Sequence, residues 1–311
     1  MTVVAVAGGT GKVGRAIVDA LNAQGKHTVL VLARETSEAK EKEIGARILA
    51  APYGDVDALT SLLEANKIEV IVSAIDLSKG PDPELNLIKA ADKSTVTRRY
   101  VVSNWAIKYN EEIADIFPVS KVKLATLKVV EGTSLEWTEV INGFFIDYLV
   151  APKVPSYQPP MAVIVDIPNN VAAIPGSGDV PVAFTHTWDI AKFVAALVDS
   201  PKKWERESYV IGSRVTLKEL VQLAEEAKGV KFTVTHDDLD TLRDGRITEL
   251  PGHVAFYPFM PKPVLQRFFA SFGILMDKGV FDLRPERTLN DEFPDIKARG
   301  VKELFLEAWK E

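Results

Sequence analysis

Three glycines near the start of the chain recur at intervals of three residues. Gly8, Gly11 and Gly14 follow a short apolar run, Val3–Ala7, and an apolar segment, Ala16–Leu21, follows them. Gly8 can adopt the backbone angles of a tight turn, Gly11 lets a ligand approach the main chain, and Gly14 lets a helix pack closely on a strand. The free N–H groups at the start of such a helix suit a pyrophosphate.

The spacing therefore predicts a dinucleotide site, with a purely structural glycine turn as the alternative. The G-x-x-G-x-x-G pattern differs from the G-x-G-x-x-G of many dehydrogenases. To the cofactor we assign the turn itself and two residues that follow another predicted strand: Gly8, Gly9, Thr10, Gly11, Lys12, Val13, Ala74 and Ile75.

Arg34 indicates which nucleotide binds. An Asp or Glu at the end of the second strand usually contacts the ribose 2′-hydroxyl of NAD. Here the strand Thr28–Ala33 is followed by Arg34, and Glu35 comes one position later, where it should point to the opposite face. An arginine can pair with the 2′-phosphate of NADP through charge-assisted hydrogen bonds. We therefore expect NADP (NADPH), although a solvated surface charge is the simpler interpretation of Arg34 alone.

Alternating strands and helices in the first half must position these residues. The strands are short and apolar, as in a parallel sheet buried on both faces. We predict an α/β, Rossmann-type doubly wound parallel sheet in residues 1–150, with ligands at the carboxyl ends of the strands. The predicted strands are Val3–Ala7, Thr28–Ala33, Val70–Ala74, Tyr100–Ser103 and Thr138–Gly143, and the predicted helices are Val13–Gln24, Asp57–Ala65, Pro83–Lys93 and Val119–Glu131.

Residues 151–311 have a different composition and are predicted to form a smaller C-terminal α+β substrate lobe. Pro and Gly are frequent in residues 151–182, which favours loops and short strands. Helices at Thr187–Asp199 and Leu217–Lys228 and a strand at Lys231–Thr235 are expected, with residues 183–200 packing back on the first domain. Residues 250–281 are rich in Phe, Pro and Met, which fits a packing region, an apolar substrate pocket or its lid.

The bulk composition narrows the possible partners. The net charge is −6 and no Lys/Arg-rich run occurs, so we expect no nucleic-acid partner. The absence of cysteine excludes thiol nucleophiles and thiolate metal sites and is compatible with a cytoplasmic location. The first apolar run is too short to span a membrane. The four histidines lack metal-ligand spacing, so we expect no metal, a small-molecule substrate, and a monomer or homodimer.

Several motifs spread along the chain resemble the NmrA-like and isoflavone-reductase-like group of atypical short-chain dehydrogenases/reductases. The matching segments are GGTGKVG at 8–14, GDVDALTSLL at 54–63, EVIVSAI at 69–75, NGFF at 142–145, WDIAKFVAAL at 188–197, GVFD at 279–282 and LNDEFPDIKARGVKEL at 289–304. The resemblance implies a Rossmann domain, a small C-terminal lobe and a cleft between them. The group contains NADPH-dependent reductases of small aromatic or polyketide-like molecules and proteins thought to sense dinucleotides without turnover.

The Tyr-x-x-x-Lys pair of short-chain dehydrogenases is absent. At the comparable place stand Phe117 and Lys121, and a phenylalanine cannot donate a proton. Tyr109 is nearby, but the residue four positions later is Ile113. Proton transfer would therefore need another residue.

The resemblance implies that this residue is a lysine fifteen positions before the threonine of the next strand. Counting back from Thr138 gives Lys123. Helix periodicity agrees, because Lys123 shares a stripe with the apolar Leu127 and Val130, whereas Lys121 shares one with Lys128. A lysine in apolar surroundings has a lowered pKa and can act as an acid or base near neutrality. We predict that Lys123 handles the proton or positions the cofactor; the alternative is a snorkelling side chain.

The remaining site residues follow the fourth and fifth predicted strands or lie in the second half. Ser103 matches the first residue of a Ser-Glu-Phe-Gly pattern in the group and is assigned a catalytic role on the carbonyl or nicotinamide, whereas Asn104, Trp105 and Ala106 depart from that pattern. Asn142 is expected to hydrogen-bond the nicotinamide or substrate. The substrate pocket is assigned to Asn104, Trp105, Phe144, Phe145, His186, His253 and Tyr257.

These residues support three functional hypotheses. The leading one is an NADPH-dependent reductase of a small, mostly apolar carbonyl or enone, with Lys123 supplying the proton. The second is a non-catalytic NAD(P) sensor that binds a regulatory protein. The third is an isomerase or cyclase that uses the same pocket.

Overall fold

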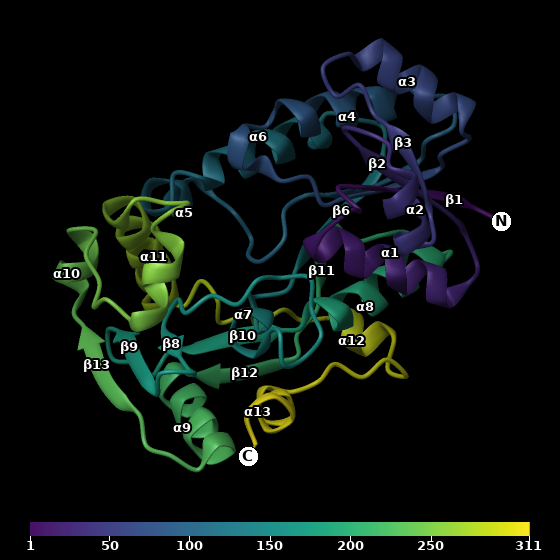
Figure 1. The fold of residues 1–311 in the computed structure, drawn as a ribbon. Coiled ribbons are helices and arrows are strands. Elements are labelled where there is room, and N and C mark those ends of the chain that lie inside the picture. Colours follow the sequence, from purple (N-terminus) through teal and green to yellow (C-terminus); the bar gives the residue numbers. More distant parts are fainter. Residues whose placement is uncertain (311) are drawn as a thin grey trace.

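A seven-stranded parallel sheet forms the centre of the N-terminal part of the protein. The computed structural model describes residues 1–310, and Figure 1 shows the sheet and its helices beside a second group of strands and helices. The predicted doubly wound sheet is confirmed, with the strand order β11-β6-β5-β4-β1-β2-β3. The strands are β1 (Val3–Ala7), β2 (Thr28–Ala33), β3 (Arg47–Ala50), β4 (Val70–Ser73), β5 (Arg99–Val102), β6 (Glu136–Ile141) and β11 (Glu207–Tyr209).

Both faces of this sheet are buried, which explains why its strands are almost continuously apolar. In β1, Val4 and Val6 pack on one face and Ala5 and Ala7 on the other, and all four are fully buried. Helices α1 (Lys12–Gln24) and α8 (Thr187–Asp199) cover the first face. Helices α3 (Val56–Ala65), α4 (Asp82–Lys93) and α6 (Ser120–Glu131) cover the second.

The sheet order reverses between β1 and β4, because β1 pairs with β2 on one side and β4 on the other. In open α/β sheets, ligands bind beyond the carboxyl ends of the strands at such a point. The residues that follow β1, β2, β4 and β5 therefore meet at one edge of the sheet. The glycine turn, Arg34, Ala74 and Ser103 all occupy such positions.

Some predicted boundaries were wrong, and several short elements were missed. Strand β6 begins at Glu136 and ends at Ile141, two residues before the predicted bounds, because Asn142 and Gly143 turn away to bond Ala106. Strand β13 (Thr233–Asp237) starts two residues late, since the Phe232 N–H still bonds Glu225 of the preceding helix. The polar helix α2 (Glu38–Ile44) and the short β3 gave no clear apolar period.

Residues from the second half of the chain complete the first sheet. Helix α8 packs against α1, and β11 pairs in parallel with β6. The rest of the second half forms two three-stranded sheets, β12-β10-β7 and β13-β9-β8. Their strands are β7 (Phe144–Phe145), β8 (Val165–Asp166), β9 (Val171–Pro175), β10 (Pro181–Thr185), β12 (Ser213–Thr216) and β13.

Further helices surround these two sheets and connect them to the first (Figure 1). They are α5 (Glu111–Ile116), α7 (Asp147–Val150), α9 (Leu217–Lys228), α10 (Leu239–Arg243), α11 (Lys262–Asp277), α12 (Leu289–Glu292) and α13 (Val301–Trp309), with 3-10 turns η1 (Leu77–Lys79) and η2 (Pro251–Phe256). Phe117, just after α5, packs against two rings of α11, with centroid distances of 5.4 Å to Phe268 and 5.3 Å to Phe272. The residue that replaces the usual tyrosine thus joins the two parts.

Two classes of feature are missing from residues 1–310. No helix there is long and apolar enough to cross a membrane. The same residues hold no group of three or more metal-ligating side chains placed to bind an ion.

The tight approach of α1 to the glycine turn predicts that residue 14 tolerates no side chain. A Cβ atom at Gly14 would lie 2.4 Å from the carbonyl oxygen of Gly8, which is backbone and cannot rotate away. We expect Gly14→Ala to lower the free energy of unfolding by ~1–3 kcal/mol, as overpacking does, measured by urea denaturation. Gly54→Ala is the control, since a Cβ at this exposed position meets no atom within 4 Å. Equal stability of the two variants would contradict the packing argument.

Candidate functional site

The glycine turn between β1 and α1 is held tightly against the loop after β4. Gly8 has a φ of +76°, and its N–H donates to the carbonyl oxygen of Leu32, 3.1 Å away. A Cβ at Gly8 would lie 2.5 Å from the carbonyl oxygen of Ala74, so only glycine fits. Gly11 differs, because a Cβ there would meet no atom within 4 Å. The space beside Gly11 is therefore open, and its contact with a ligand stays a prediction.

The first turn of α1 is free of features that would repel an anion. Gly11 caps the helix without a side-chain hydrogen bond, and the first turn contains no acidic residue. Lys12 is exposed, has a φ of +50°, and its Nζ lies 3.5 Å from Asp76 Oδ2. The Ser78 N–H and the Lys12 charge lower the pKa of Asp76. The main-chain N–H groups at this helix end are therefore available to a phosphate, with the exposed cation of Lys12 beside them.

Arg34 follows β2 at the same edge of the sheet. Its side chain is exposed. Thr10 lies in the glycine turn, and Val13 is a buried residue in the first turn of α1. The nucleotide residues predicted from the sequence thus share one edge of the sheet.

Lys123 lies on the side of α6 that faces the sheet. Its Nζ donates to the main-chain carbonyl oxygen of Ser103, the first residue after β5. Burial lowers the pKa of this amine to about 8, and the negative charges of Glu84 and Asp76 oppose that shift. Lys121, on the same helix, is exposed. The structure therefore places one half-buried amine, and not its neighbour, at the carboxyl end of β5.

Ser103 is enclosed by hydrogen bonds that use both its main chain and its hydroxyl. Its Oγ donates to the carbonyl oxygen of Ile75, 2.9 Å away, and its N–H donates to Glu84 Oε1 at 3.0 Å. The residue is 2% exposed. These contacts hold the loops after β4 and β5 together, so the hydroxyl has a structural partner in this structure.

Asn104 and Trp105 also bond neighbouring main chain. The indole Nε1 of Trp105 donates to the carbonyl oxygen of Ser73 at 3.2 Å. The amide nitrogen of Asn104 lies 3.4 Å from the carbonyl oxygen of Lys123 and 3.5 Å from Glu139 Oε2. Burial raises the pKa of Glu139 to about 7. Asn104 Oδ1 is buried and has no hydrogen-bond partner within residues 1–310.

Asn142 shapes the loop that follows β5. Its Oδ1 accepts from the Ala106 N–H at 3.0 Å, and its Nδ2 donates to the carbonyl oxygen of Gly143 at 3.0 Å. The Ala106 carbonyl in turn accepts from the N–H groups of Asn142 and Gly143. Ala106 has a φ of +103°, a conformation that favours glycine. Both polar atoms of the Asn142 side chain are thus engaged with the main chain.

Two of the predicted aromatic residues, Phe144 and Phe145, pack on the same ring, that of Tyr148. Phe144 is 4% exposed and packs edge-to-face on Tyr148, Phe184 and Phe272, with ring centroids 5.4, 5.9 and 6.1 Å away. Phe145 is partly buried and contacts Tyr148 at 6.0 Å. This cluster joins β7 to α11, the helix on which Phe117 also packs.

The two predicted pocket histidines are buried and bonded to protein atoms. His186 caps α8 through its Nδ1, which also meets Arg299, and its Nε2 lies 3.4 Å from Asp147. His253 bonds the Leu250 N–H and the Ala162 carbonyl. Burial lowers the pKa of both imidazoles. Tyr257 is half-buried and donates to Glu249 at 2.5 Å. Within residues 1–310, none of these three residues forms a hydrogen bond or an ion pair with Lys123.

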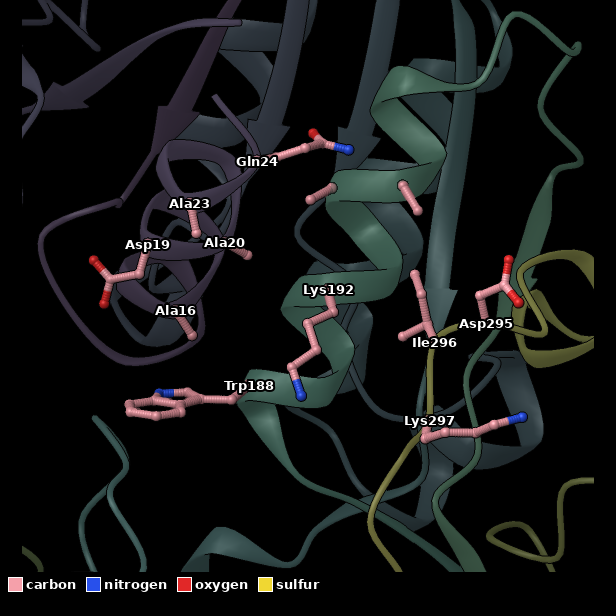
Figure 2. Close-up of a pocket in the computed structure, with 12 residues that line it drawn as sticks. Ala16, Asp19, Ala20, Ala23, Gln24, Trp188, Lys192, Asp295, Ile296 and Lys297 are labelled. Atoms are coloured by element: carbon pink, nitrogen blue, oxygen red, sulfur yellow. The ribbon is translucent and has the colours of Figure 1, made fainter. Parts of the chain in front are cut away.

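A pocket of about 690 Å³ lies elsewhere, between α1 and α8. Figure 2 shows Ala16, Ala20 and Ala23 on α1, Trp188 and Lys192 on the neighbouring α8, and Ile296 on the segment at the other side of α8. None of the residues predicted for the cofactor, the substrate or the proton lines it. Volume alone therefore does not identify the chemical site.

Comparison with known proteins places this geometry in a family. Residues 1–303 match the model of the NmrA-like family. The chain belongs to the NmrA-like family. It is 31% identical to the oxidoreductase swnN of Metarhizium robertsii, over 99% of this chain and 98% of that protein. It is 36% identical to the oxidoreductase BOA1 of Botryotinia fuckeliana, over 75% and 78% of the two chains.

Solved structures share the fold of this NmrA-like protein. Leucoanthocyanidin reductase from Vitis vinifera, in a ternary complex, superposes with a TM-score of 0.75 at 20% identity and covers 97% of this chain and 98% of that one. AtPrR2 with NADP⁺ and (+)pinoresinol gives a TM-score of 0.74 at 21% identity, with 98% of both chains covered. The resemblance inferred from motifs is thereby confirmed for family and fold.

Sequence reasoning missed Glu84, which contacts the Ser103 segment from α4. The signal was present, since Glu84 shares a helical stripe with the apolar Leu87, Ile88 and Ala91. All four side chains are fully buried. A single carboxyl group on a core-facing stripe indicates an unusual buried ionisable residue.

The backbone of Ala106 predicts that glycine at this position would stabilise the protein. We expect Ala106→Gly to raise the free energy of unfolding by ~1 kcal/mol, because relief of backbone strain exceeds the added chain entropy of glycine. Ala125→Gly in α6 is the control and should lower it by ~1 kcal/mol. Urea denaturation measures both, and a less stable Ala106→Gly variant would refute strain at this residue.

Proposed function

We propose that this protein is an NADPH-dependent reductase of a small, mostly apolar carbonyl or enone compound. The observation that carries the proposal is the Lys123 amine, whose pKa burial lowers to about 8 and which lies against the Ser103 carbonyl at the carboxyl end of β5. A buried amine that titrates near neutral pH can donate a proton to a substrate oxygen. Relatives named oxidoreductases support the same reaction class.

The residues at the sheet edge fit a dinucleotide phosphate. Gly11 leaves open space, α1 begins without an acidic side chain, and Arg34 is exposed after β2. In the proposed complex the α1 N–H groups and Lys12 hold the pyrophosphate, and Arg34 holds the 2′-phosphate. When bound, NADPH supplies a hydride from C4 of its nicotinamide. The fold neighbours solved with NADPH or NADP⁺ support this cofactor.

Lys123 supplies the proton that the reduction needs besides the hydride. The protonated amine gives a proton, directly or through water, to the oxygen that becomes a hydroxyl. The Ser103 carbonyl keeps the amine pointed at the end of β5. Phe117 cannot perform this step, and it packs instead on Phe268 and Phe272.

The substrate class follows from the side chains of the second part. Phe144 and Phe145 come directly after Asn142, and several large apolar residues near η2 and α11 are exposed: Val254 at 57%, Phe259 at 88% and Val264 at 52%. Exposed apolar side chains in one segment favour an apolar ligand or a lid over it. Relatives named phenylcoumaran benzylic ether reductase and pinoresinol reductase support an aromatic substrate.

NADPH turnover with a panel of aromatic ketones and enones tests the proposal. We expect Lys123→Ala to lower kcat by about 10²–10⁴-fold, the usual contribution of a positioned proton donor. NADPH binding, followed by fluorescence, should be retained. Lys121→Ala is the matched control, since this exposed lysine lies on the same helix and should turn over substrate normally. NADPH binding without turnover of any compound, or equal turnover in Lys123→Ala, would contradict the reductase proposal.

The pH dependence of the wild-type enzyme gives an independent measurement. Only the protonated amine can donate, so kcat should fall as the pH rises through about 8, the pKa of Lys123. On the acid side of this value the lysine is protonated and the rate should not depend on it. A profile that rises through pH 8 would assign the lysine the opposite role, that of a base.

Arg34 predicts discrimination between the two nicotinamide cofactors. We expect Arg34→Ala to weaken NADPH binding roughly ten- to hundredfold, the value of a hydrogen bond to a charged group, and to leave NADH binding nearly unchanged. Arg47→Ala is the control, because this exposed arginine is the first residue of β3 and lies at the amino ends of the strands, away from the candidate site. Fluorescence titration measures both cofactors. Equal weakening of NADPH and NADH would exclude a 2′-phosphate contact.

A further inference from the structure

Glu84 places a carboxyl group in the core directly behind the candidate site. It lies in the first turn of α4 and is fully buried. Its Oε1 accepts from the Ser103 N–H at 3.0 Å, and its Oε2 accepts from the Ser73 hydroxyl. The side chain therefore joins the carboxyl ends of β4 and β5, the two strands whose following loops carry Ile75 and Ser103.

Glu84 and Lys123 bond the same residue from opposite directions. The N–H of Ser103 donates to Glu84, and the carbonyl oxygen of Ser103 accepts from the Lys123 amine. The two groups also interact through their charges, since each shifts the titration of the other toward the ionised form. A hydrogen-bonded unit of Glu84, Ser103 and Lys123 thus links α4 to α6 across the end of β5.

Local contacts favour an ionised Glu84 despite its burial. Both of its oxygens accept hydrogen bonds, and its place in the first turn of α4 lets the helix dipole stabilise a negative charge. Burial acts in the other direction and raises the pKa of the carboxyl group. Tyr100 of β5 and Tyr53 of the β3–α3 loop face it as well; burial raises the pKa of each phenol, so both stay neutral.

We propose that Glu84 is a positioning residue that holds Ser103 and provides the buried counter-charge that keeps Lys123 protonated at neutral pH. The proposal rests on the proposed function for the role of the proton, but the charge coupling itself does not depend on turnover. Asp76 also faces the amine and favours its charged form, but its carboxylate is largely exposed and pairs with Lys12. Solvent screens such a charge, whereas it hardly screens Glu84.

Direct titration of the Lys123 amine tests the coupling. In protein labelled with carbon-13 at lysine Cε, the Lys123 signal is assigned by its loss in Lys123→Arg and followed by NMR against pH. We expect the wild-type transition near pH 8. In Glu84→Gln, which keeps the size of the side chain and one acceptor oxygen for the Ser103 N–H but removes the charge, the transition should fall by roughly one pH unit or more. An unchanged or higher transition would overturn the proposal.

Two further variants separate charge from structure. Asp82→Asn makes the same charge change in the same first turn of α4. Because Asp82 is exposed, the Lys123 transition in this variant should match that of the wild type. Glu84→Asp keeps the buried charge and should restore most of the wild-type value. A shift in Asp82→Asn as large as that in Glu84→Gln would show a general helix effect and overturn the proposal.

Ser73→Ala provides the test if Glu84→Gln does not fold. Loss of the Ser73 hydroxyl removes one donor to the carboxylate, which disfavours its ionised form. The Lys123 transition should then fall, though by less than in Glu84→Gln, and an unchanged transition would again overturn the proposal.

The activity profile extends the test to the reaction. The alkaline limb of kcat should move to lower pH in Glu84→Gln by the same amount as the NMR transition. If the protein turns over no substrate, the NMR result still decides the charge coupling, so the two proposals fail separately. A shifted NMR transition with an unshifted limb would show that the charge coupling does not govern the reaction, and it would overturn the catalytic part of the proposal.

Discussion

The close contact between the glycine turn and the loop after β4 is the constraint on which the rest of the site depends. Gly8 touches the Ala74 carbonyl and Gly14 touches Gly8, so β1, α1 and β4 approach with no room for a side chain. This approach brings the start of α1 to the crossing point of the sheet and leaves Gly11 open. Other candidate residues, such as Arg34 and Ser103, follow strands of the same sheet, so their positions depend on this approach as well.

A second set of contacts fixes the main chain of the loop after β5, which lies beside Lys123. Ser103, Trp105 and Ala106 are fixed by bonds to Glu84, Ser73 and Asn142, which come from three other elements. Side chains that in the sequence looked free to contact a substrate are used to shape this loop. The amine of Lys123 joins this network through the Ser103 carbonyl, and its protonation depends on the charges enclosed with it.

The sequence predicted the sheet, its flanking helices and the nucleotide edge because these depend on local patterns. Apolar runs, glycine spacing and the position of Arg34 after β2 are all visible in one dimension. The partners of Asn142, His186 and Ser103 were not predictable, since each bonds an atom distant along the chain. Glu84 was detectable as a charge on an apolar stripe, but its contact with Ser103 required the packing of α4 against β5.

The second half of the chain adds β11 and α8 to the first sheet, and this limits where the protein can be cut into separate fragments. Strand β11 covers the outer edge of β6, and α8 covers an apolar face of the sheet beside α1. A fragment that ended at residue 150 would expose β6 as an unpaired edge strand together with the bare flank of α1. Such edges pair readily with other chains. The nucleotide-binding half is therefore contiguous in space but not in sequence, and cutting the gene at the apparent boundary would produce an aggregating fragment.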